Sequence, residues 1–492
     1  MVFNSLQFFL FFPVVTILYF LLPHRFRAYL LLTASVVFYM AFIPKYVLIL
    51  AFTIVVDYYA GILIERAEGK VRKGFLALSI VANVGVLAFF KYFNFLNGNL
   101  GALAEALGLH DPLPVLRIIL PIGLSFHTFQ AMSYTIEVYR GNYKAERNFI
   151  IYALYVMFYP QLVAGPIERP QNLLHQFREE HNFDYQRVVD GLKLMAWGLF
   201  KKVVIADRLA MFVNQVYDAP RGFAGLPLIV ATVAFAFQIF CDFSGYSDIA
   251  IGSAQVMGFR LMTNFRRPYW SQSIHEFWSR WHISLSTWFR DYFYIPLGGN
   301  KVGWSRWQIN LMLTFIISGL WHGANWTFIT WGALNGFYLV FSLWTRGYRA
   351  RIAEAVGLNA WPTVARGLRT GLTFFFICVS WVFFRAASMS DAFYILGHSF
   401  DGLSGALSRG KLAELASLVT LAVGGSIVNV LAPALAIIAM EILHYLQEQG
   451  ISIRQAIASR PPVVRWALYY GLVMATVLFG SYLPSQFIYF QF

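Results

Sequence analysis

The chain has 492 residues, of which 58% are hydrophobic, 18% aromatic and 13% charged. A soluble domain carries about 25% charged residues, so this composition excludes an ordinary water-soluble enzyme. It indicates instead a helical membrane protein with many spans. In so apolar a chain, we attribute the net charge of +14 to basic loops at the cytoplasmic face rather than to nucleic-acid binding. Cys241 and Cys378 lie in apolar segments and predict neither a disulfide nor a metal site.

Apolar segments long enough to cross a bilayer recur along the whole chain. We expect one all-α integral membrane domain over residues 1–492, with about 11–13 transmembrane or re-entrant helices. Additional C-terminal membrane helices are expected over about 368–485. The predicted spans lie near residues 5–22, 28–43, 46–64, 75–96, 116–136, 149–165, 189–215, 227–258, 309–322, 325–345, 368–385, 415–443 and 465–485.

The first loops indicate the orientation. The basic runs at 24–27 and 65–73 are separated by two predicted helices, so they lie on one side. The positive-inside rule makes that side cytoplasmic and places the N-terminus outside. The loop predicted at 97–115 contains no Lys or Arg and falls outside. The orientation after residue 165 stays open, because charged pairs interrupt the apolar runs.

A single histidine stands in a long uncharged stretch. Residues 307–345 contain no Asp, Glu, Lys or Arg, and His322 is the only residue there that titrates near neutral pH. Ionisable groups inside a membrane are costly and usually mark a functional path, although a satisfied core histidine is the alternative. A neutral imidazole suits a general base. We expect Asn325, three residues on, to hydrogen-bond the ring and set its tautomer.

Two glycine steps surround this histidine. Gly319 and Gly323 form one G-x-x-x-G step, and Gly332 and Gly336 form a second on the next segment. Such steps let two helices approach closely. The stretch predicts either two full spans with the histidine near their turn or a partly re-entrant pair with the histidine at depth.

The polar region at 260–308 predicts one aromatic helix. Ser273 followed by Glu276 fits a capping box, so the helix should begin there. His275 and His282 recur at helical spacing and are expected on one face of this helix. The alternative is an interfacial helix in an aromatic belt without a catalytic role.

Two acids lie in the apolar segment Q-I-F-C-D-F-S-G-Y-S-D-I-A-I-G. Asp242 and Asp248 are six residues apart, with Tyr246 between them. Carboxylates in a span line a water-filled cavity or pair with cations. Arg266 and Arg267 are the expected partners, and a boundary network of salt bridges is the alternative reading.

These motifs resemble those of the membrane-bound O-acyltransferase family. The resemblance rests on S-I-H-E-F-W-S-R-W-H-I-S-L-S-T-W-F-R-D-Y-F-Y-I-P-L-G-G-N, on G-L-W-H-G-A-N-W-T-F-I-T-W-G, and on F-F-K-Y-F-N-F-L, F-Y-P-Q-L-V-A-G-P-I-E-R-P and C-D-F-S-G-Y-S-D-I-A-I-G. They are most similar to the bacterial branch that contains the alginate O-acetyltransferase membrane subunit and the teichoic acid D-alanyl transferase. The core motifs span about 89–345.

The resemblance implies a fold and an activity. It implies a ring of helices around a central funnel, in the bacterial inner membrane, with the family's membrane histidine at His322 and a second histidine at His282. It implies O-acetylation of an exported polysaccharide such as alginate, with acetyl-CoA as donor, no bound cofactor, and periplasmic acetyltransferase partners beside the surrounding lipid. His322 is expected to act as base, and His282 or an indole N–H to stabilise the oxyanion, although the order of roles stays open. The residues expected along the tunnel are Asp242, Tyr246, Asp248, Trp281, Trp321 and Asn325.

Three alternatives remain. The motifs are shared with enzymes that transfer D-alanyl or acetyl groups to teichoic acid, peptidoglycan or cellulose. Acylation of a protein or lipid is a second alternative. A transporter of small molecules or lipids is the non-enzyme alternative, but it would favour inverted repeats, and we find none in the sequence.

Overall fold

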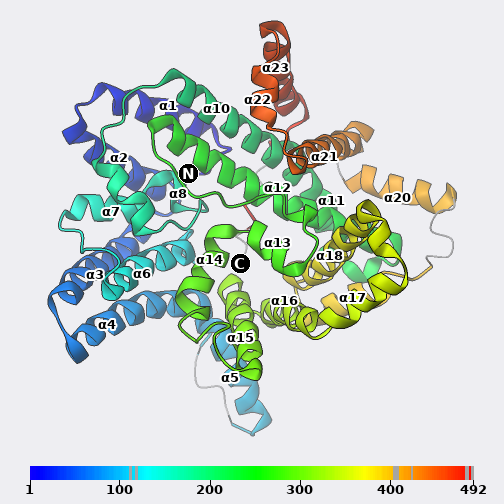
Figure 1. Cartoon of the computed structure of the whole chain (residues 1–492), viewed down its shortest axis with the longest axis horizontal. Coiled ribbons are helices and arrows are strands. Elements are labelled where there is room, and N and C mark those ends of the chain that lie inside the picture. The colour runs from blue at the N-terminus through cyan, green and yellow to red at the C-terminus, as the bar shows by residue number, and fades with distance from the viewer. Residues whose placement is uncertain (110–113, 117–119, 403–408, 423–424, 483–486, 489–492) are drawn as a thin grey trace. The chain divides into compact units, whose positions relative to one another are not determined.

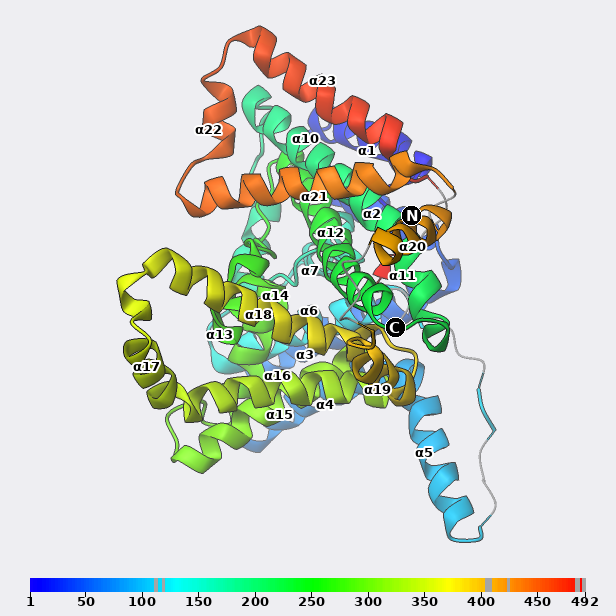
Figure 2. The same ribbon diagram turned by 90° about the vertical axis from the view of Figure 1, so that its right-hand side faces the viewer.

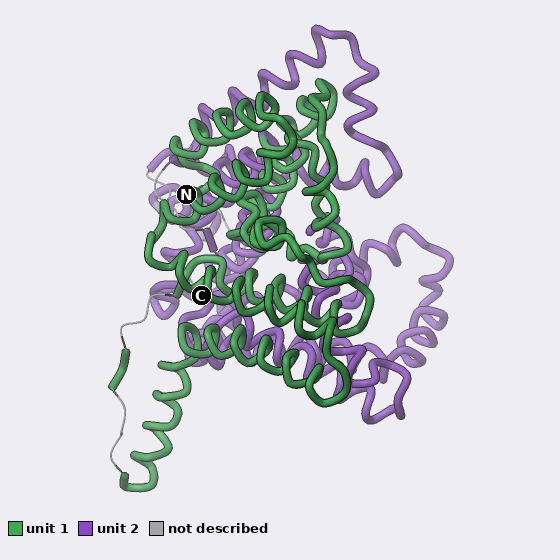
Figure 3. The backbone as a smooth tube through the Cα atoms, turned by 90° about the vertical axis from the view of Figure 1, so that its left-hand side faces the viewer, with its two compact units in different colours: residues 1–195, 246–263 green, residues 196–245, 264–492 purple. Residues whose placement is uncertain are grey.

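The structure is a computed structural model that describes residues 1–109, 114–116, 120–402, 409–422, 425–482 and 487–488. Throughout these residues the secondary structure is helical, and they contain no strand. The chain forms two compact units (Figure 3). Unit 1 comprises residues 1–195 and 246–263, and unit 2 comprises residues 196–245 and 264–492.

Unit 1 is built from the N-terminal helices (Figure 1). They are α1 (Leu6–Leu21), α2 (His24–Met40), α3 (Val47–Arg66), α4 (Gly69–Leu87), α5 (Phe93–Ala106), α6 (Leu124–Arg140), α7 (Phe149–Met157), α8 (Tyr159–Leu162) and α9 (Pro170–Leu173). A π-helical turn at Ala88–Tyr92 joins α4 to α5. Two further helices contribute residues to both units, namely α10 (Tyr185–Phe200) and α12 (Leu226–Met257).

Unit 2 holds both histidines predicted for the site. Its helices are α11 (Asp207–Tyr217), α13 (Ile274–Arg280), α14 (Ile283–Phe289), α15 (Trp304–His322), α16 (Trp326–Trp344), α17 (Arg346–Ala355), α18 (Pro362–Arg385), α19 (Met389–His398), α20 (Arg409–Ala422), α21 (Ile427–Glu448), α22 (Ile453–Ala458) and α23 (Pro462–Phe479). Two π-helical turns, Lys201–Ala206 and Arg290–Tyr294, follow α10 and α14.

Six helical stretches in the described residues are long and apolar enough to cross a membrane. They are Pro44–Arg66, Gly69–Ala106, Leu226–Met257, Pro362–Arg385, Ile427–Glu448 and Pro462–Phe479. Two shorter apolar helices are Leu6–Leu21 and Leu412–Leu421. The expectation of an all-α, multi-pass membrane protein is therefore confirmed. His282 and His322 both lie outside these six stretches.

Two segment boundaries differ from the prediction. Residues 97–106 were expected in a loop but continue the helix to Ala106, because the Leu, Ala and Glu residues there favour a helix. The prediction of a single span at 415–443 is wrong. Two helices, α20 and α21, occupy this part of the chain, and Gly425, with φ +77°, precedes the N-cap Ser426 of the second helix. Residues 423–424 lie outside the described part.

The glycine steps bring α15 and α16 into close contact. The two helices lie side by side in both views (Figures 1 and 2). A Cβ on Gly319 would lie 2.2 Å from the carbonyl oxygen of Phe328 and 3.2 Å from the Cα of Gly332. This confirms the predicted close approach. The turn of residues 323–325 joins the helices, so His322 ends α15 at that turn.

Candidate active site

His322 lies in an aromatic cage inside unit 2. Its side chain is buried, with 4% of the residue exposed. Ring centroids of Trp321 and Trp331 lie 4.9 Å from that of the imidazole, and the ring of Phe384 lies at 5.4 Å. These rings come from α15, α16 and α18. The cage keeps bulk water from the imidazole and surrounds it with low dielectric, which strengthens any electrostatic interaction made there.

His282 shares a neighbour with His322. The ring of Trp321 lies 6.4 Å from His282 and 4.9 Å from His322, centroid to centroid. Both histidines therefore lie around one indole ring, that of Trp321, although 40 residues separate them in the sequence.

The predicted continuous aromatic helix is wrong. The helix begins as expected, because the Ser273 hydroxyl accepts the N–H of Glu276 at 3.1 Å. It ends at Arg280, and His282 has the left-handed backbone φ 43°, ψ 54° before α14 begins. The break turns the two histidines apart, leaving His275 exposed while His282 is 1% exposed. Residue spacing alone does not reveal a left-handed histidine.

Asn264 anchors this break, and sequence reasoning missed it. Its Oδ1 lies 3.0 Å from Nδ1 of His282 and 3.0 Å from the hydroxyl of Ser284, which donates to it. Its carbonyl oxygen accepts the N–H of Ile283 at 2.9 Å. The only sequence signal was a polar residue following a buried helix, 18 positions before the histidine.

Asp242 belongs to a buried ion cluster. Nζ of Lys202 lies 2.6 Å from Oδ1 of Asp242 and 2.8 Å from Oδ1 of Asp207. The second oxygen of Asp242 accepts the N–H of Ile488 at 2.7 Å. Asp242 thus pairs with a cation, as was expected of a carboxylate in a span. The prediction that Arg267 is its partner is wrong, because Nε of Arg267 lies 2.6 Å from Oε1 of Glu448.

The other acid of that segment belongs to unit 1. Asp248 is half-buried in α12. Tyr246, also in unit 1, is 2% exposed, and its ring lies 4.4 Å from that of Phe3.

Trp281 and Asn325 have structural roles in unit 2. Trp281 is 1% exposed, stacks on Phe277 at 5.5 Å and lies 5.0 Å from the ring of Trp381. Asn325 was expected to hydrogen-bond His322, and this is wrong. Its Oδ1 caps α16 by accepting the N–H of Thr327 at 3.1 Å, and its Nδ2 donates to the carbonyl of Ala387 at 3.4 Å. The amide therefore fixes the turn after the histidine rather than the tautomer of its ring.

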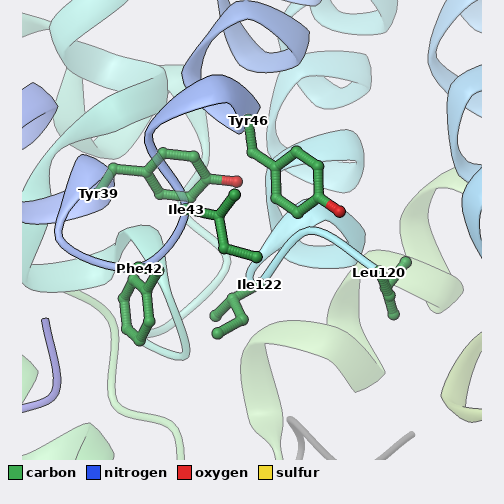
Figure 4. A pocket seen from close by; sticks show the side chains of 6 residues that line it. All are labelled: Tyr39, Phe42, Ile43, Tyr46, Leu120 and Ile122. Atoms are coloured by element: carbon green, nitrogen blue, oxygen red, sulfur yellow. The ribbon is translucent and has the colours of Figure 1, made fainter. Parts of the chain in front are cut away.

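Unit 1 contains an apolar pocket that holds none of the predicted site residues (Figure 4). Its lining offers two phenol groups but no carboxylate, imidazole or amine. The lining residues are Tyr39, Phe42, Ile43, Tyr46, Leu120 and Ile122.

Comparison with known proteins gives a consistent answer. A protein described as "probable alginate O-acetylase AlgI" from Azotobacter vinelandii is 42% identical over 85% of this chain and 82% of its own length. The peptidoglycan O-acetyltransferase of Helicobacter pylori is 35% identical over 76% of this chain and 74% of its own. The teichoic acid D-alanyltransferase of Streptococcus thermophilus is 30% identical over 46% of this chain and 57% of its own.

The family model for membrane-bound O-acyltransferases matches residues 73–355, which is more than half of the chain and includes both histidines. Unit 2 provides the two buried imidazoles that the family resemblance implied, around one indole ring. The chain belongs to the membrane-bound O-acyltransferase family and is an O-acyltransferase.

Proposed function

We propose that this enzyme transfers an acetyl group from cytoplasmic acetyl-CoA across the membrane for O-acetylation of an exported polysaccharide, alginate or a similar exopolysaccharide. The observation that carries the proposal is the buried pair of imidazoles, His282 and His322, around Trp321. Two relatives named for O-acetylation, of alginate and of peptidoglycan, support acetyl as the group transferred.

The proposal includes the expected setting in the membrane. The chain is a single domain of the bacterial inner membrane, in which about 11–13 spanning or re-entrant helices surround a funnel. Six candidate spans and the apolar composition support it. Periplasmic acetyltransferase proteins and the polysaccharide are the partners in this scheme.

The reaction needs a general base and a hydrogen-bond donor in a site from which bulk water is excluded. The acceptor hydroxyl oxygen attacks the thioester carbonyl carbon while an imidazole nitrogen takes the hydroxyl proton. A hydrogen-bond donor stabilises the oxyanion that forms. The C–S bond then breaks, and the imidazolium returns the proton to the leaving thiolate, which gives an acetyl ester and the CoA thiol. His322, inside its aromatic cage, is the residue we assign to the reacting centre.

The test uses a strain that lacks the gene and is complemented with single variants. His322→Ala and His282→Ala should abolish ester-linked acetyl groups on the surface polysaccharide, measured by NMR of the isolated polymer. His275→Ala is the matched control, because that histidine is exposed and seven residues from His282. Immunoblots of membranes should show equal protein levels.

The outcomes separate the parts of the proposal. Unchanged acetylation of every surface polysaccharide in the deletion strain would contradict the function. Full acetylation by His322→Ala would contradict the role of that residue alone. Transfer of labelled alanine in place of acetyl would establish the D-alanyl alternative instead.

A further inference from the structure

Helix α17 of unit 2 packs against very little of the protein. It joins the end of α16 to the segment before α18 (Figure 2), and none of its ten residues is buried. Tyr348, Ile352 and Val356, which directly follows the helix, are 61% to 68% exposed. Isolated helices shorter than about 12–15 residues are marginal in water, and most gain their stability by packing an apolar face. A surface that covers these side chains would therefore stabilise α17.

The exposed side chains of α17 divide into two faces. Tyr348 and Ile352 are four residues apart, so they lie on one apolar stripe along the helix. Arg349 and Arg351 flank this stripe, and Glu354 is two residues after Ile352, about 200° further round the helix. An apolar stripe with arginines beside it is typical of a helix that lies in the plane of a membrane interface. The arginine stems can cover apolar surface while the guanidinium groups reach the lipid headgroups.

A candidate membrane span begins close to α17. The helix Pro362–Arg385 is long and apolar enough to cross a bilayer, and only residues 356–361 separate it from α17. This connection reaches at most about 25 Å, because an extended chain spans about 3.3–3.6 Å per residue. Trp361, directly before the span, is exposed, and tryptophan is enriched where a membrane meets water. Since the end of a span lies at the membrane surface, α17 lies near that surface as well.

The charges at this end of unit 2 indicate which side of the membrane it faces. Residues 345–369 contain five arginines and one acid. Arg366 lies 3.4 Å from Oε2 of Glu448, so the end of α21 lies at the same end of the unit, and the next residues, 449–465, contain three arginines and no acid. The connection at the other end of α18 and α21, residues 386–426, contains two basic and three acidic residues. The positive-inside rule therefore makes the end with α17 cytoplasmic.

We propose that α17 lies in the cytoplasmic membrane interface, with its apolar stripe among lipid acyl chains and its arginines on the phosphates of anionic phospholipids. A guanidinium group binds phosphate through paired hydrogen bonds, and the anionic lipids of the cytoplasmic leaflet attract basic residues next to a span. The same assignment orients unit 2, because α18 and α23 then run outward from the cytoplasm and α21 runs inward. Since α16 packs against α15, α17 anchors the end of this helix pair that lies away from His322.

Single cysteines that carry an environment-sensitive fluorophore test the placement of the two faces. Ile352→Cys puts the label on the apolar stripe, and Glu354→Cys is the matched control on the opposite face of the same helix. In lipid nanodiscs, the label at position 352 should emit at shorter wavelength and be quenched by nitroxide-labelled lipids, whereas the label at position 354 should report water. Cys241 and Cys378 are buried, and the wild type treated with the same reagent gives the background. Equal emission and equal quenching at both positions would overturn the proposal.

The lipid charge is tested by thermal unfolding in nanodiscs of phosphatidylcholine, with or without phosphatidylglycerol. Phosphatidylglycerol should raise the unfolding midpoint of the wild type, and Arg346→Gln with Arg351→Gln should remove most of this gain. A purely structural role of these arginines would lower the midpoint equally in both lipids. Arg221→Gln, at an exposed arginine 3.9 Å from Asp391 of α19, is the control and should keep the gain. An equal gain in the double variant, or the same gain from inorganic phosphate in phosphatidylcholine, would overturn binding of a lipid headgroup.

The side of the membrane is tested with a maleimide that does not cross bilayers. Arg351→Cys should react only after the membrane of spheroplasts is opened, because α17 faces the cytoplasm in the proposal. Arg221→Cys is the control from the other end of α18, since Arg221 lies beside α19, and it should react in intact spheroplasts. Reaction of Arg351→Cys in intact spheroplasts would overturn the cytoplasmic placement of α17.

Discussion

The imidazole of His322 and the indole of Trp331 lie 4.9 Å apart, centroid to centroid, with their ring planes 85° apart. Trp331 is 1% exposed, and within the described residues its indole N–H has no hydrogen-bond partner. A buried donor left unsatisfied costs about 1–3 kcal/mol, so such a group calls for an explanation. A donor on a ring beside the histidine that we propose to react is suited to an oxyanion that exists only during the reaction.

Trp331→Phe should therefore lower acetyl transfer roughly 10- to 100-fold, because it removes the N–H and keeps an aromatic ring. Its cost in stability should be small, since loss of the unsatisfied donor offsets the smaller ring. Trp381→Phe is the control, because Trp381 stacks on Trp331 at 6.0 Å. The rate of acetyl transfer and the thermal unfolding midpoint in detergent are measured for both. Equal rate losses in the two variants would show that packing alone matters.

The sequence predicted the features that depend on local pattern. Hydropathy predicted a span at 368–385, which lies within the observed helix Pro362–Arg385, because a membrane helix needs only a long apolar run. The capping box placed the start of α13, because both partners lie within one turn. The glycine steps predicted the contact of α15 with α16, because a missing Cβ is visible in the sequence.

The features that depend on packing between distant segments were not predictable. Arg266 and Arg267 were expected to pair with Asp242 because they are near in sequence. The observed partner, Lys202, is brought there from 40 residues upstream by the π-turn after α10. The left-handed turn at His282 depends in the same way on hydrogen bonds that oxygens of Asn264 accept from Ile283 and Ser284, and no residue pattern reveals them.

Gly332→Ala should destabilise unit 2 by about 1–3 kcal/mol, the typical cost of overpacking. A Cβ there would lie 2.3 Å from the carbonyl oxygen of Phe315 and 3.2 Å from the Cα of Gly319, and backbone atoms cannot yield cheaply. Gly371→Ala in α18 is the control, because its Cβ would meet no atom within 4 Å. That change should be neutral or stabilising, since alanine favours a helix by up to about 1 kcal/mol over glycine. Thermal unfolding in detergent compares the two, and equal midpoints would contradict the contact.

Glu168 predicts a pH-dependent stability in unit 1. It is completely buried, and burial raises its pKa to about 7, against the hydrogen bonds from Met262 N–H and Asn172 Nδ2, which lower it. The folded state therefore binds a proton more tightly than the unfolded chain, in which the pKa is near 4.5. The stabilisation that comes from this tighter proton binding is complete below pH 4.5 and is lost as the pH rises through 7.

Glu168→Gln should remove this dependence, because the amide keeps the shape without the charge. The unfolding midpoint of the wild type should fall by several degrees more than that of the variant between pH 5 and pH 8. Glu179→Gln, an exposed acid, is the control and should follow the wild type. Parallel curves for wild type and Glu168→Gln would show that Glu168 does not titrate in this range.

Lys202 is expected to be the most costly single charge to remove from unit 2. It is 3% exposed and pairs with two buried carboxylates, those of Asp207 and Asp242. Lys202→Met would leave both acids buried without it, and breaking a buried pair typically costs about 3–5 kcal/mol. Lys193→Met is the comparison: this lysine lies 3.7 Å from Asp190 and its side chain is 35% exposed, so solvent screens the pair and its loss should cost less.

A second variant shows whether Lys202→Met loses stability through uncompensated charge or through lost side-chain packing. Adding Asp207→Asn and Asp242→Asn to Lys202→Met removes the two charges but keeps oxygen acceptors, including one for the N–H of Ile488. If uncompensated charge is the cause, this triple variant should be more stable than Lys202→Met alone, because a neutral buried cluster avoids the desolvation penalty. SDS-induced unfolding in mixed micelles gives the free energies. A triple variant less stable than Lys202→Met would show that the carboxylates stabilise unit 2 through contacts other than the lysine.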